Sequence, residues 1–126
     1  MNTVTNKQGI LFIVSAPSGA GKTTLIKSLV DDDPNLMVSI SYTTRSSRAD
    51  EIQDKSYHFV NRNTFEKLVQ EDKFLEHALV FNHRYGTPKD WVEQKLKAGI
   101  DIVLEIDWQG AQQVSQSLSN TVSLFI

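Results

Sequence analysis

Residues 10–30 decide the fold of this chain and read ILFIVSAPSGAGKTTLIKSLV. The start of this stretch is apolar and rich in β-branched residues, which is typical of a strand buried on both faces of a parallel sheet. After a glycine-containing turn, Leu25, Ile26, Leu29 and Val30 have the spacing of an amphipathic helix. A buried strand that leads through a turn into a helix predicts a parallel α/β sheet.

The turn between this strand and helix carries a phosphate-binding motif. Residues 16–23, APSGAGKT, match the pattern GxxxxGK[ST] except that alanine occupies the first position. Gly19 and Gly21 let the backbone point several N–H groups at one anion, and the helix N-terminus adds its positive dipole end. Lys22 can reach the β- and γ-phosphates, and the Thr23 hydroxyl suits Mg²⁺. The competing interpretation is a glycine turn with an exposed lysine.

The composition is that of an ordinary globular domain. The chain has 126 residues, of which 40% are hydrophobic and 22% charged, with 13 basic and 15 acidic side chains and no cysteine. The small negative net charge argues against nucleic-acid binding, and the lack of cysteine excludes disulfides, thiolate catalysis and Cys-ligated zinc. No apolar run has the length of a membrane span and residues 1–8 are polar. We therefore expect a cytoplasmic protein without nucleic-acid or membrane partners.

The rest of the chain continues the alternation of strands and helices around a more polar middle. The first helix should end before Pro34. Later elements are predicted as strands at 37–41, 57–60, 74–81, 102–106 and 121–126, and as helices around Phe65–Val69, from Thr87-Pro88 to Gly99, and around Ala111–Leu118. Asn63 and Glu66 resemble a capping pair, and residues 43–56 read as an exposed loop. This order favours a parallel sheet with right-handed crossovers and an inserted subdomain at residues 41–90.

Two acidic residues follow the predicted strand 102–106. Glu105 and Asp107 lie at its carboxyl end, where ligands bind in open α/β sheets. They could orient Mg²⁺ waters, as the acidic group of a Walker B strand does. The alternative is a strand-terminal charge in solvent. Beside a phosphate loop we favour a functional role for Asp107, with Glu105 as a second candidate.

The polar middle offers residues for a second phosphate. Arg45 and Arg48 lie three apart in the loop, with Ser41 before them and Tyr57 after them. Guanidinium groups bind phosphate oxygens with planar, bidentate geometry. Paired arginines in a loop are, however, usually solvated, so this pattern alone is weak.

Glu76 stands in an otherwise apolar stretch that is predicted to be a strand. A half-buried carboxylate needs hydrogen-bond donors. Guanine offers two adjacent donors, N1–H and N2–H₂, whereas adenine presents an acceptor at N1 and would leave the carboxylate unpaired. Glu76 is therefore a candidate for guanine recognition; the alternative is a side chain that points outward from an edge strand.

Taken in order, these segments closely resemble the guanylate kinase family. The matching segments are 15–24 (SAPSGAGKTT), 41–48 (SYTTRSSR), 57–59 (YHF), 74–78 (FLEHA), 85–87 (YGT) and 104–110 (LEIDWQG). The likeness runs from about residue 9 to the end of the chain. The family's phosphate loop tolerates a small residue at the position of Ala16. The joint pattern is far more specific than any single segment.

The resemblance implies Mg²⁺-dependent transfer of the γ-phosphoryl group of ATP to GMP or dGMP, giving ADP and GDP, in purine nucleotide metabolism. It would place Ser18, Gly19, Ala20, Gly21, Lys22, Thr23 and Thr24 on ATP, with Thr23 as the Mg²⁺ ligand. It would place Arg45, Arg48, Tyr57 and Tyr85 on the GMP phosphate, Ser41, Glu76 and Thr87 on guanine, and Asp107 also at the nucleotide. The implied catalytic residues are Lys22, Arg45 and Arg48. The histidines and tryptophans read as structural or surface residues.

The resemblance also implies a domain layout. Residues 9–40 and 91–126 would form a P-loop NTPase-type nucleotide-binding core, residues 41–90 a mixed α+β GMP-binding insert, and residues 1–8 a flexible tail. In the family the chain continues past the strand 121–126 into an arginine-bearing lid and closing helices. We therefore expect residues 1–126 to be a partial guanylate kinase domain, incomplete at the C-terminus. Alone, it should be poorly active and prone to associate.

The sequence is also compatible with two other functions. One is a P-loop kinase for another phosphorylated small molecule, which would share the phosphate loop but not the guanine set. The other is a guanylate-kinase-like protein-interaction module without catalysis. Such modules tend to have a degraded phosphate loop, whereas Gly19, Gly21, Lys22 and Thr23 are all present here.

Overall fold

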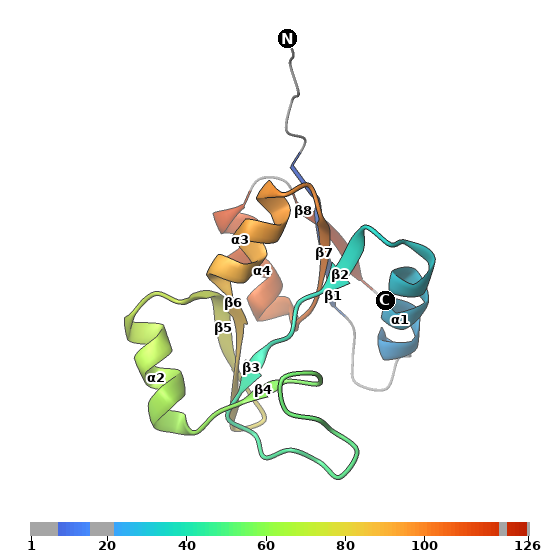
Figure 1. The fold of residues 1–126 in the computed structure, drawn as a ribbon. Coiled ribbons are helices and arrows are strands. Elements are labelled where there is room, and N and C mark those ends of the chain that lie inside the picture. The colour runs from blue at the N-terminus through green and yellow to red at the C-terminus, as the bar shows by residue number, and fades with distance from the viewer. Residues whose placement is uncertain (1–7, 16–21, 119–120, 126) are drawn as a thin grey trace. The chain divides into compact units, whose positions relative to one another are not determined.

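The computed structural model describes residues 8–15, 22–118 and 121–125 (Figure 1). In chain order the elements are β1 (Leu11–Ser15), α1 (Lys22–Asp32), β2 (Leu36–Val38), β3 (Tyr42–Thr43), β4 (His58–Phe59), α2 (Arg62–Gln70), β5 (Phe74–Val80), β6 (His83–Pro88), α3 (Lys89–Lys97), β7 (Asp101–Glu105), α4 (Trp108–Ser117) and β8 (Thr121–Phe125). The predicted tail and most of the predicted phosphate loop lie outside the described residues.

The chain divides into two compact units. One comprises Met1–Ser39 and Trp91–Ile126, and the other Ile40–Asp90. We refer to them as the core unit and the inserted unit. The inserted unit begins directly after Ser39, whose N–H still donates to the carbonyl of Val103 at 3.1 Å in the core sheet.

The core unit is built on a parallel four-stranded sheet with the order β2-β7-β1-β8. β1 lies between β7 and β8 and pairs with both in parallel, so that Leu11 is in register with Ile102 on one side and Thr121 on the other. Leu11, Ile13 and Val14 are fully buried and Phe12 is half-buried, as expected for a strand with neighbours on both faces. The parallel α/β core predicted from the sequence is confirmed.

A hydrophobic cluster joins α1 to this sheet. Ile26 of α1 packs with Val14, Leu36 and Val103, each less than a tenth exposed. Burying one such aliphatic side chain contributes roughly 1.5–3 kcal/mol. Just after α3, Gly99 has a φ of 84°, a backbone conformation that glycine adopts without cost.

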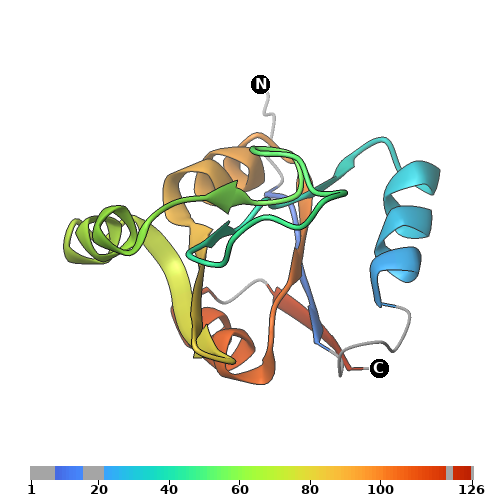
Figure 2. The same cartoon turned by 90° about the horizontal axis from the view of Figure 1, so that it is seen from below.

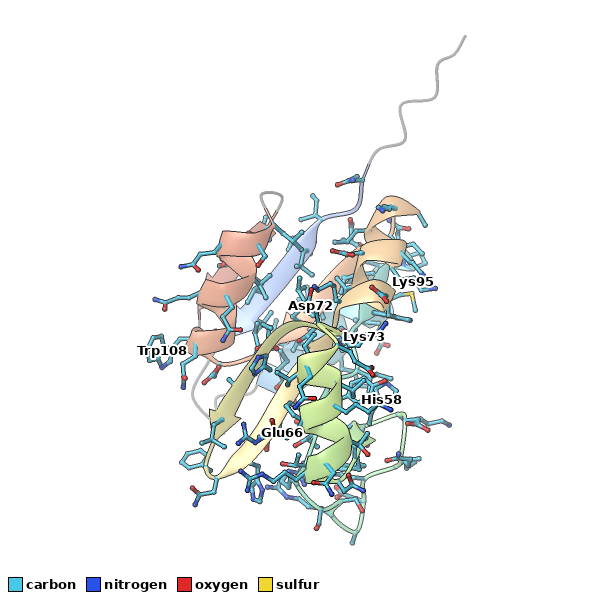
Figure 3. All side chains as sticks on the ribbon, turned by 90° about the vertical axis from the view of Figure 1, so that its left-hand side faces the viewer. His58, Glu66, Asp72, Lys73, Lys95 and Trp108 are labelled. Carbon is cyan, nitrogen blue, oxygen red and sulfur yellow. The ribbon has the colours of Figure 1, made fainter. Side chains whose placement is uncertain are left out.

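The inserted unit contains a mixed four-stranded sheet with the order β4-β3-β6-β5. β5 and β6 form an antiparallel hairpin, β3 is antiparallel to β6, and β4 is parallel to β3. α2 lies beside the β5–β6 hairpin (Figure 2). The buried Phe65 of α2 contacts Phe74 of β5 at 4.7 Å between ring centroids, and Glu66 of α2 (labelled in Figure 3) forms an ion pair with Arg84 of β6 at 3.1 Å.

Two predicted helix starts were wrong. α2 is capped by Asn61, whose Oδ1 accepts from the N–H of Thr64 at 2.8 Å, and not by Asn63. Thr87 and Pro88 end strand β6, and α3 begins only at Lys89. The Thr87 hydroxyl is bonded across the sheet to β5, so a tertiary contact takes the group that would otherwise cap the helix.

The strands of the inserted unit also differ from the prediction. The strand expected at 37–41 ends early, because β2 stops at Val38 in the core sheet; β3, at Tyr42–Thr43 in the other sheet, was not predicted. β6 was not predicted, because its sequence HRYGTP lacks an alternation of apolar and polar residues. Within the described ranges no helix is long and apolar enough to cross a membrane, and the longest, α1, has 11 residues.

Candidate functional site

One face of the inserted sheet carries three of the candidate residues, Glu76, Tyr85 and Thr87. Directly opposed residues of paired strands lie on the same face, and the faces alternate along each strand. Glu76 is opposite Thr87, and Thr43 is opposite both Tyr85 and Phe59. Tyr85 and Thr87 are two apart on β6, so all five side chains share one face. We call it the site face.

The opposite face of this sheet is covered by α2. It carries Phe74 and His77, whose rings are 6.3 Å apart, and Tyr42, whose ring contacts Phe74 at 5.6 Å. Gly86 lies beneath this cluster, and a Cβ at its position would approach the Phe74 ring to 2.8 Å. The aromatic packing therefore fixes the hairpin that presents Glu76 and Thr87 on the other side.

Glu76 and Thr87 form a buried pair on the site face. Glu76 is 4% exposed and Thr87 is fully buried, and the Thr87 hydroxyl donates to Glu76 Oε1 at 2.6 Å. The prediction left open whether Glu76 points outward from an edge strand; the side chain is buried. A carboxylate in such a position costs free energy unless hydrogen-bond donors face it. Thr87 provides one donor and fixes the orientation of the group.

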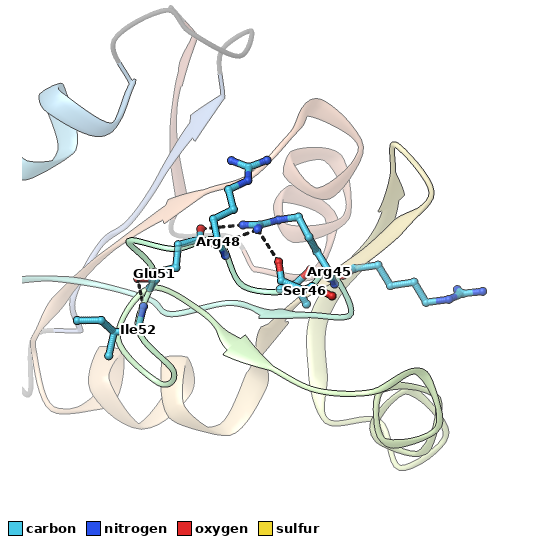
Figure 4. Close-up of polar contacts among 8 residues, drawn as sticks. Arg45, Ser46, Arg48, Glu51 and Ile52 are labelled. Carbon is cyan, nitrogen blue, oxygen red and sulfur yellow. Dashed lines mark hydrogen bonds and ion pairs between the residues drawn. The ribbon is translucent and has the colours of Figure 1, made fainter.

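Arg45 forms the most extensive polar contact of the inserted unit (Figure 4). Its Nη1 and Nη2 donate to Oε1 and Oε2 of Glu51, both at 2.8 Å, and Nη1 also donates to the carbonyl of Ser46 at 2.9 Å. The guanidinium lies 5.2 Å from the ring centroid of Tyr57 and 5.8 Å from that of Phe59. Two aromatic rings and one carboxylate thus hold this cation in place.

The charges of this pair are strongly coupled. The side-chain hydrogen bond from Arg45, followed by the backbone N–H of Arg48, lowers the pKa of Glu51 from 4.5 to about 2. Conversely, the hydrogen bond to Glu51 raises the pKa of Arg45, burial opposes this, and the Tyr85 hydroxyl adds to it. Both groups therefore stay ionised throughout the neutral range.

Arg48 is held through its backbone N–H. Its N–H donates to Glu51 Oε1 at 2.7 Å, and the residue is exposed. Figure 4 draws no dashed contact to the Arg48 guanidinium. Glu51 therefore fixes both arginines, one by its guanidinium and the other by its backbone.

The structure brings several predicted residues of the inserted unit together. The Tyr57 and Tyr85 rings are 6.0 Å apart, and both tyrosines are close to Arg45. Glu76 and Thr87 lie on the same face as Tyr85. Ser41 is half-buried at the entrance to β3, where its carbonyl accepts from the N–H of His58 at 2.9 Å.

The predicted ATP-binding residues lie at the start of α1 and before it. Lys22, Thr23 and Thr24 form the first turn of α1, and Thr24 is exposed. Ser18, Gly19, Ala20 and Gly21 lie outside the described residues, as do the side chains of Lys22 and Thr23. Strand β1 ends just before the phosphate-binding motif and α1 begins at its lysine, Lys22, as the motif requires.

Glu105 and Asp107 lie at the carboxyl end of β7. Glu105 is exposed, and Asp107 is the N-cap of α4, where its Oδ1 accepts from the N–H of Gly110 at 3.1 Å. In the described part of the chain, no group of three or more His, Asp or Glu residues could hold a metal ion.

Two residues of the site were missed by the sequence analysis. Glu51 holds both arginines, and Phe59 provides the second ring beside Arg45. A signal for Glu51 was available, since an acidic residue three positions after Arg48 can neutralise a basic loop. Phe59 carried no separate signal, because its place beside Arg45 depends on the pairing of β4 with β3.

The fold and these contacts define a class of protein: an α/β protein of the P-loop NTPase type with an inserted unit. The family model of guanylate kinase matches residues 8–126. The chain is 53% identical over 118 residues to a guanylate kinase of Saccharophagus degradans and 49% identical over 121 residues to that of Escherichia coli K12. The chain belongs to the guanylate kinase family.

A solved structure supports this assignment. The crystal structure of guanylate kinase from Anaplasma phagocytophilum superposes with a TM-score of 0.83 at 33% identity, and the match covers 94% of this chain and 60% of that one. The alignments with the Saccharophagus and Escherichia coli proteins cover 94% of this chain and 58% of each relative. The chain thus spans somewhat more than half the length of the relatives that it matches.

Proposed function

We propose that this chain is part of an ATP:GMP phosphotransferase that transfers the γ-phosphoryl group of ATP to GMP or dGMP, giving ADP and GDP. The observation that carries the proposal is the buried Glu76–Thr87 pair, which shares a sheet face with Tyr85. A phosphate site and a carboxylate on one surface suit a guanine nucleotide. We further propose that the protein works in the cytoplasm, where both nucleotides are available.

Guanine would be recognised by Glu76 together with Thr87 and Ser41. The Glu76 carboxylate can accept from N1–H and N2–H₂ of guanine at once, while the Thr87 hydroxyl keeps it oriented. Adenine would leave this buried carboxylate facing an acceptor, which costs about 1–3 kcal/mol. Asp107 would act at the nucleotide from the end of β7.

The GMP phosphate would be held by Arg45, Arg48, Tyr57 and Tyr85. Arg45 is already fixed by Glu51 and two aromatic rings, so little side-chain freedom is lost when a phosphate arrives. The exposed Arg48 would add its guanidinium to this contact. Tyr57 and Tyr85 offer hydroxyl donors.

ATP would bind at residues 18–24, with Lys22 near the β- and γ-phosphates. Mg²⁺ would be held by the Thr23 hydroxyl and by phosphate oxygens, with Glu105 and Asp107 available to orient its water ligands. When bound, the ion would neutralise charge on the transferred phosphoryl group. Lys22, Arg45 and Arg48 would position the two anionic nucleotides and stabilise the charge that develops between them.

The Glu76→Gln variant tests the guanine site. Its amide NH₂ would face the donors of guanine, so we expect the Kd for GMP to rise about 10- to 100-fold while the Kd for ATP stays unchanged. Isothermal titration calorimetry with GMP, AMP and ATP measures both constants. Thr87→Ser keeps the hydroxyl donor and serves as the control. Equal loss of GMP and ATP binding, or a wild-type chain that binds AMP as well as GMP, would contradict the proposal.

A further inference from the structure

The loop that carries Arg45 and Arg48, called the arginine loop below, is joined to β4 by a turn. This turn contains an aspartate in an uncommon backbone conformation. Asp54 has a φ of 67°, in the left-handed region that glycine, asparagine and aspartate tolerate best. Its N–H donates to the carbonyl of Tyr57 at 2.8 Å, and the N–H groups of Lys55 and Ser56 donate to the carbonyl of Ile52. These bonds close residues 52–57 into a compact turn.

Two consecutive side chains fasten this turn to β4. Asp54 Oδ1 lies 2.7 Å from Nδ1 of His58, whose ring packs against Tyr42 at 4.5 Å between centroids. Gln53 bonds the backbone of Phe59 twice, accepting from its N–H at 3.0 Å and donating to its carbonyl at 3.2 Å. The turn is therefore attached to the edge strand by a side chain on each of two neighbouring residues.

This attachment lies next to the groups that hold the arginines. Only Ile52 separates Glu51 from Gln53, so the position of the Glu51 carboxylate depends on where the turn is held. His58 (labelled in Figure 3) is flanked in sequence by Tyr57 and Phe59, the two rings beside Arg45. The loop is thus held at one end by the contacts of Glu51 with the two arginines. At the other end it is held by the attachment of the turn to β4.

We propose that Asp54 and His58 are a positioning pair for the phosphate-binding arginines. The inference rests on the proposed function, because it assigns the pair to the phosphate group of a nucleoside monophosphate. Neither residue contacts the ligand; they act through the turn on Glu51 and, through Glu51, on Arg45 and Arg48. A loop that is ordered before the ligand arrives does not subtract its ordering entropy from the binding free energy.

Three substitutions separate the contact from the backbone conformation. Asp54→Gly keeps the left-handed backbone and removes the carboxylate, whereas His58→Phe keeps a ring on Tyr42 and removes Nδ1. Asp54→Asn tolerates the same backbone and keeps an oxygen that can accept from Nδ1–H. The readouts are the Kd values for GMP and ATP on the 126-residue chain, and hydrogen exchange of the Arg48 and Phe59 amides.

We expect Asp54→Gly and His58→Phe each to weaken GMP binding about three- to tenfold, without a change in ATP binding, and to speed exchange of both amides. The double variant should bind GMP no more weakly than the worse single variant, because both remove the same contact. Asp54→Asn should restore GMP binding to within about twofold of wild type, since the oxygen acceptor is kept.

The matched control is Asp72→Gly. Asp72 also has a left-handed backbone, with a φ of 56°, and its carboxylate is bonded to Lys89 at 2.6 Å, but it follows α2 at a different turn (Figure 3). This variant should leave GMP binding and both amides unchanged.

The experiment can refute the positioning pair separately from the proposed function. If wild type binds GMP and Asp54→Gly binds it equally well, or if the two single effects add fully, the positioning pair is refuted while the GMP site stands. If wild type binds no GMP, the proposed function is refuted, and the positioning role with it.

Discussion

At the residue scale, Glu51 shows how one carboxylate can organise two cations. It accepts from both terminal nitrogens of Arg45 and from the backbone N–H of Arg48. A charged group with three donors is stabilised in its ionised form, which is why its pKa falls to about 2. The order of the arginine loop is thereby linked to the charge of a single residue.

This linkage predicts a pH-dependent difference between wild type and Glu51→Gln. The folded-state pKa lies below the ordinary value of 4.5, so the contribution of Glu51 to stability is present above pH 4.5 and is lost as the pH falls through about 2. The gap in unfolding free energy between the two proteins should therefore narrow over this range. Urea titrations at several pH values measure it. A gap that stays constant from neutral pH to pH 2 would contradict the ion pair.

At the scale of single elements, local sequence signals located the helices but not their first residues. Asn61 directly precedes α2, and Asn63 lies in its first turn. The sequence favoured Asn63 as the cap, because Glu66 follows it three residues later. The structure uses Asn61, because its backbone is extended while that of the following residues is helical. Which residue caps a helix depends on the backbone conformation at that residue. Here this conformation depends on where strand β4 ends.

The two asparagines give a matched pair of variants. Asn61→Ala removes the acceptor for the Thr64 N–H and should lower the unfolding free energy by about 1 kcal/mol. Asn63→Ala, within the first turn of α2, should change it by less than about 0.5 kcal/mol. Chemical denaturation followed by circular dichroism compares them. A larger loss of unfolding free energy for Asn63→Ala than for Asn61→Ala would mean that Asn63 caps the helix, as predicted from the sequence.

At the scale of the whole molecule, leucines in strands differ widely in burial. Leu104 of β7 is 1% exposed, whereas Leu79 of β5 is 54% exposed. Both are leucines in strands, so intrinsic strand propensity is the same and only burial differs. The free energy of the core therefore depends on sheet order, in which β7 lies between β2 and β1.

This difference predicts unequal costs for the same substitution. Leu104→Ala should lower the unfolding free energy by about 2–5 kcal/mol, because it removes buried methyl groups and leaves a cavity. Leu79→Ala should cost less than about 0.5 kcal/mol. Guanidinium titrations of both variants test this. Comparable losses would mean that Leu79 is buried in solution.

The sequence by itself determined the parallel core and the nature of the proposed site. The apolar run before the glycine turn and the helical spacing after it predict a buried strand and its crossover helix, because these patterns reflect the local period of each structure. The arginines, Tyr57 and Glu76 were identified by the chemistry of their side chains, and Tyr85 by the resemblance to the guanylate kinase family. Tertiary structure alone decided that Thr87 ends a strand and bonds Glu76, that Asn61 caps α2, and that Glu51 holds both arginines. These contacts join residues that meet only through strand pairing or loop closure, and no local period encodes such pairings.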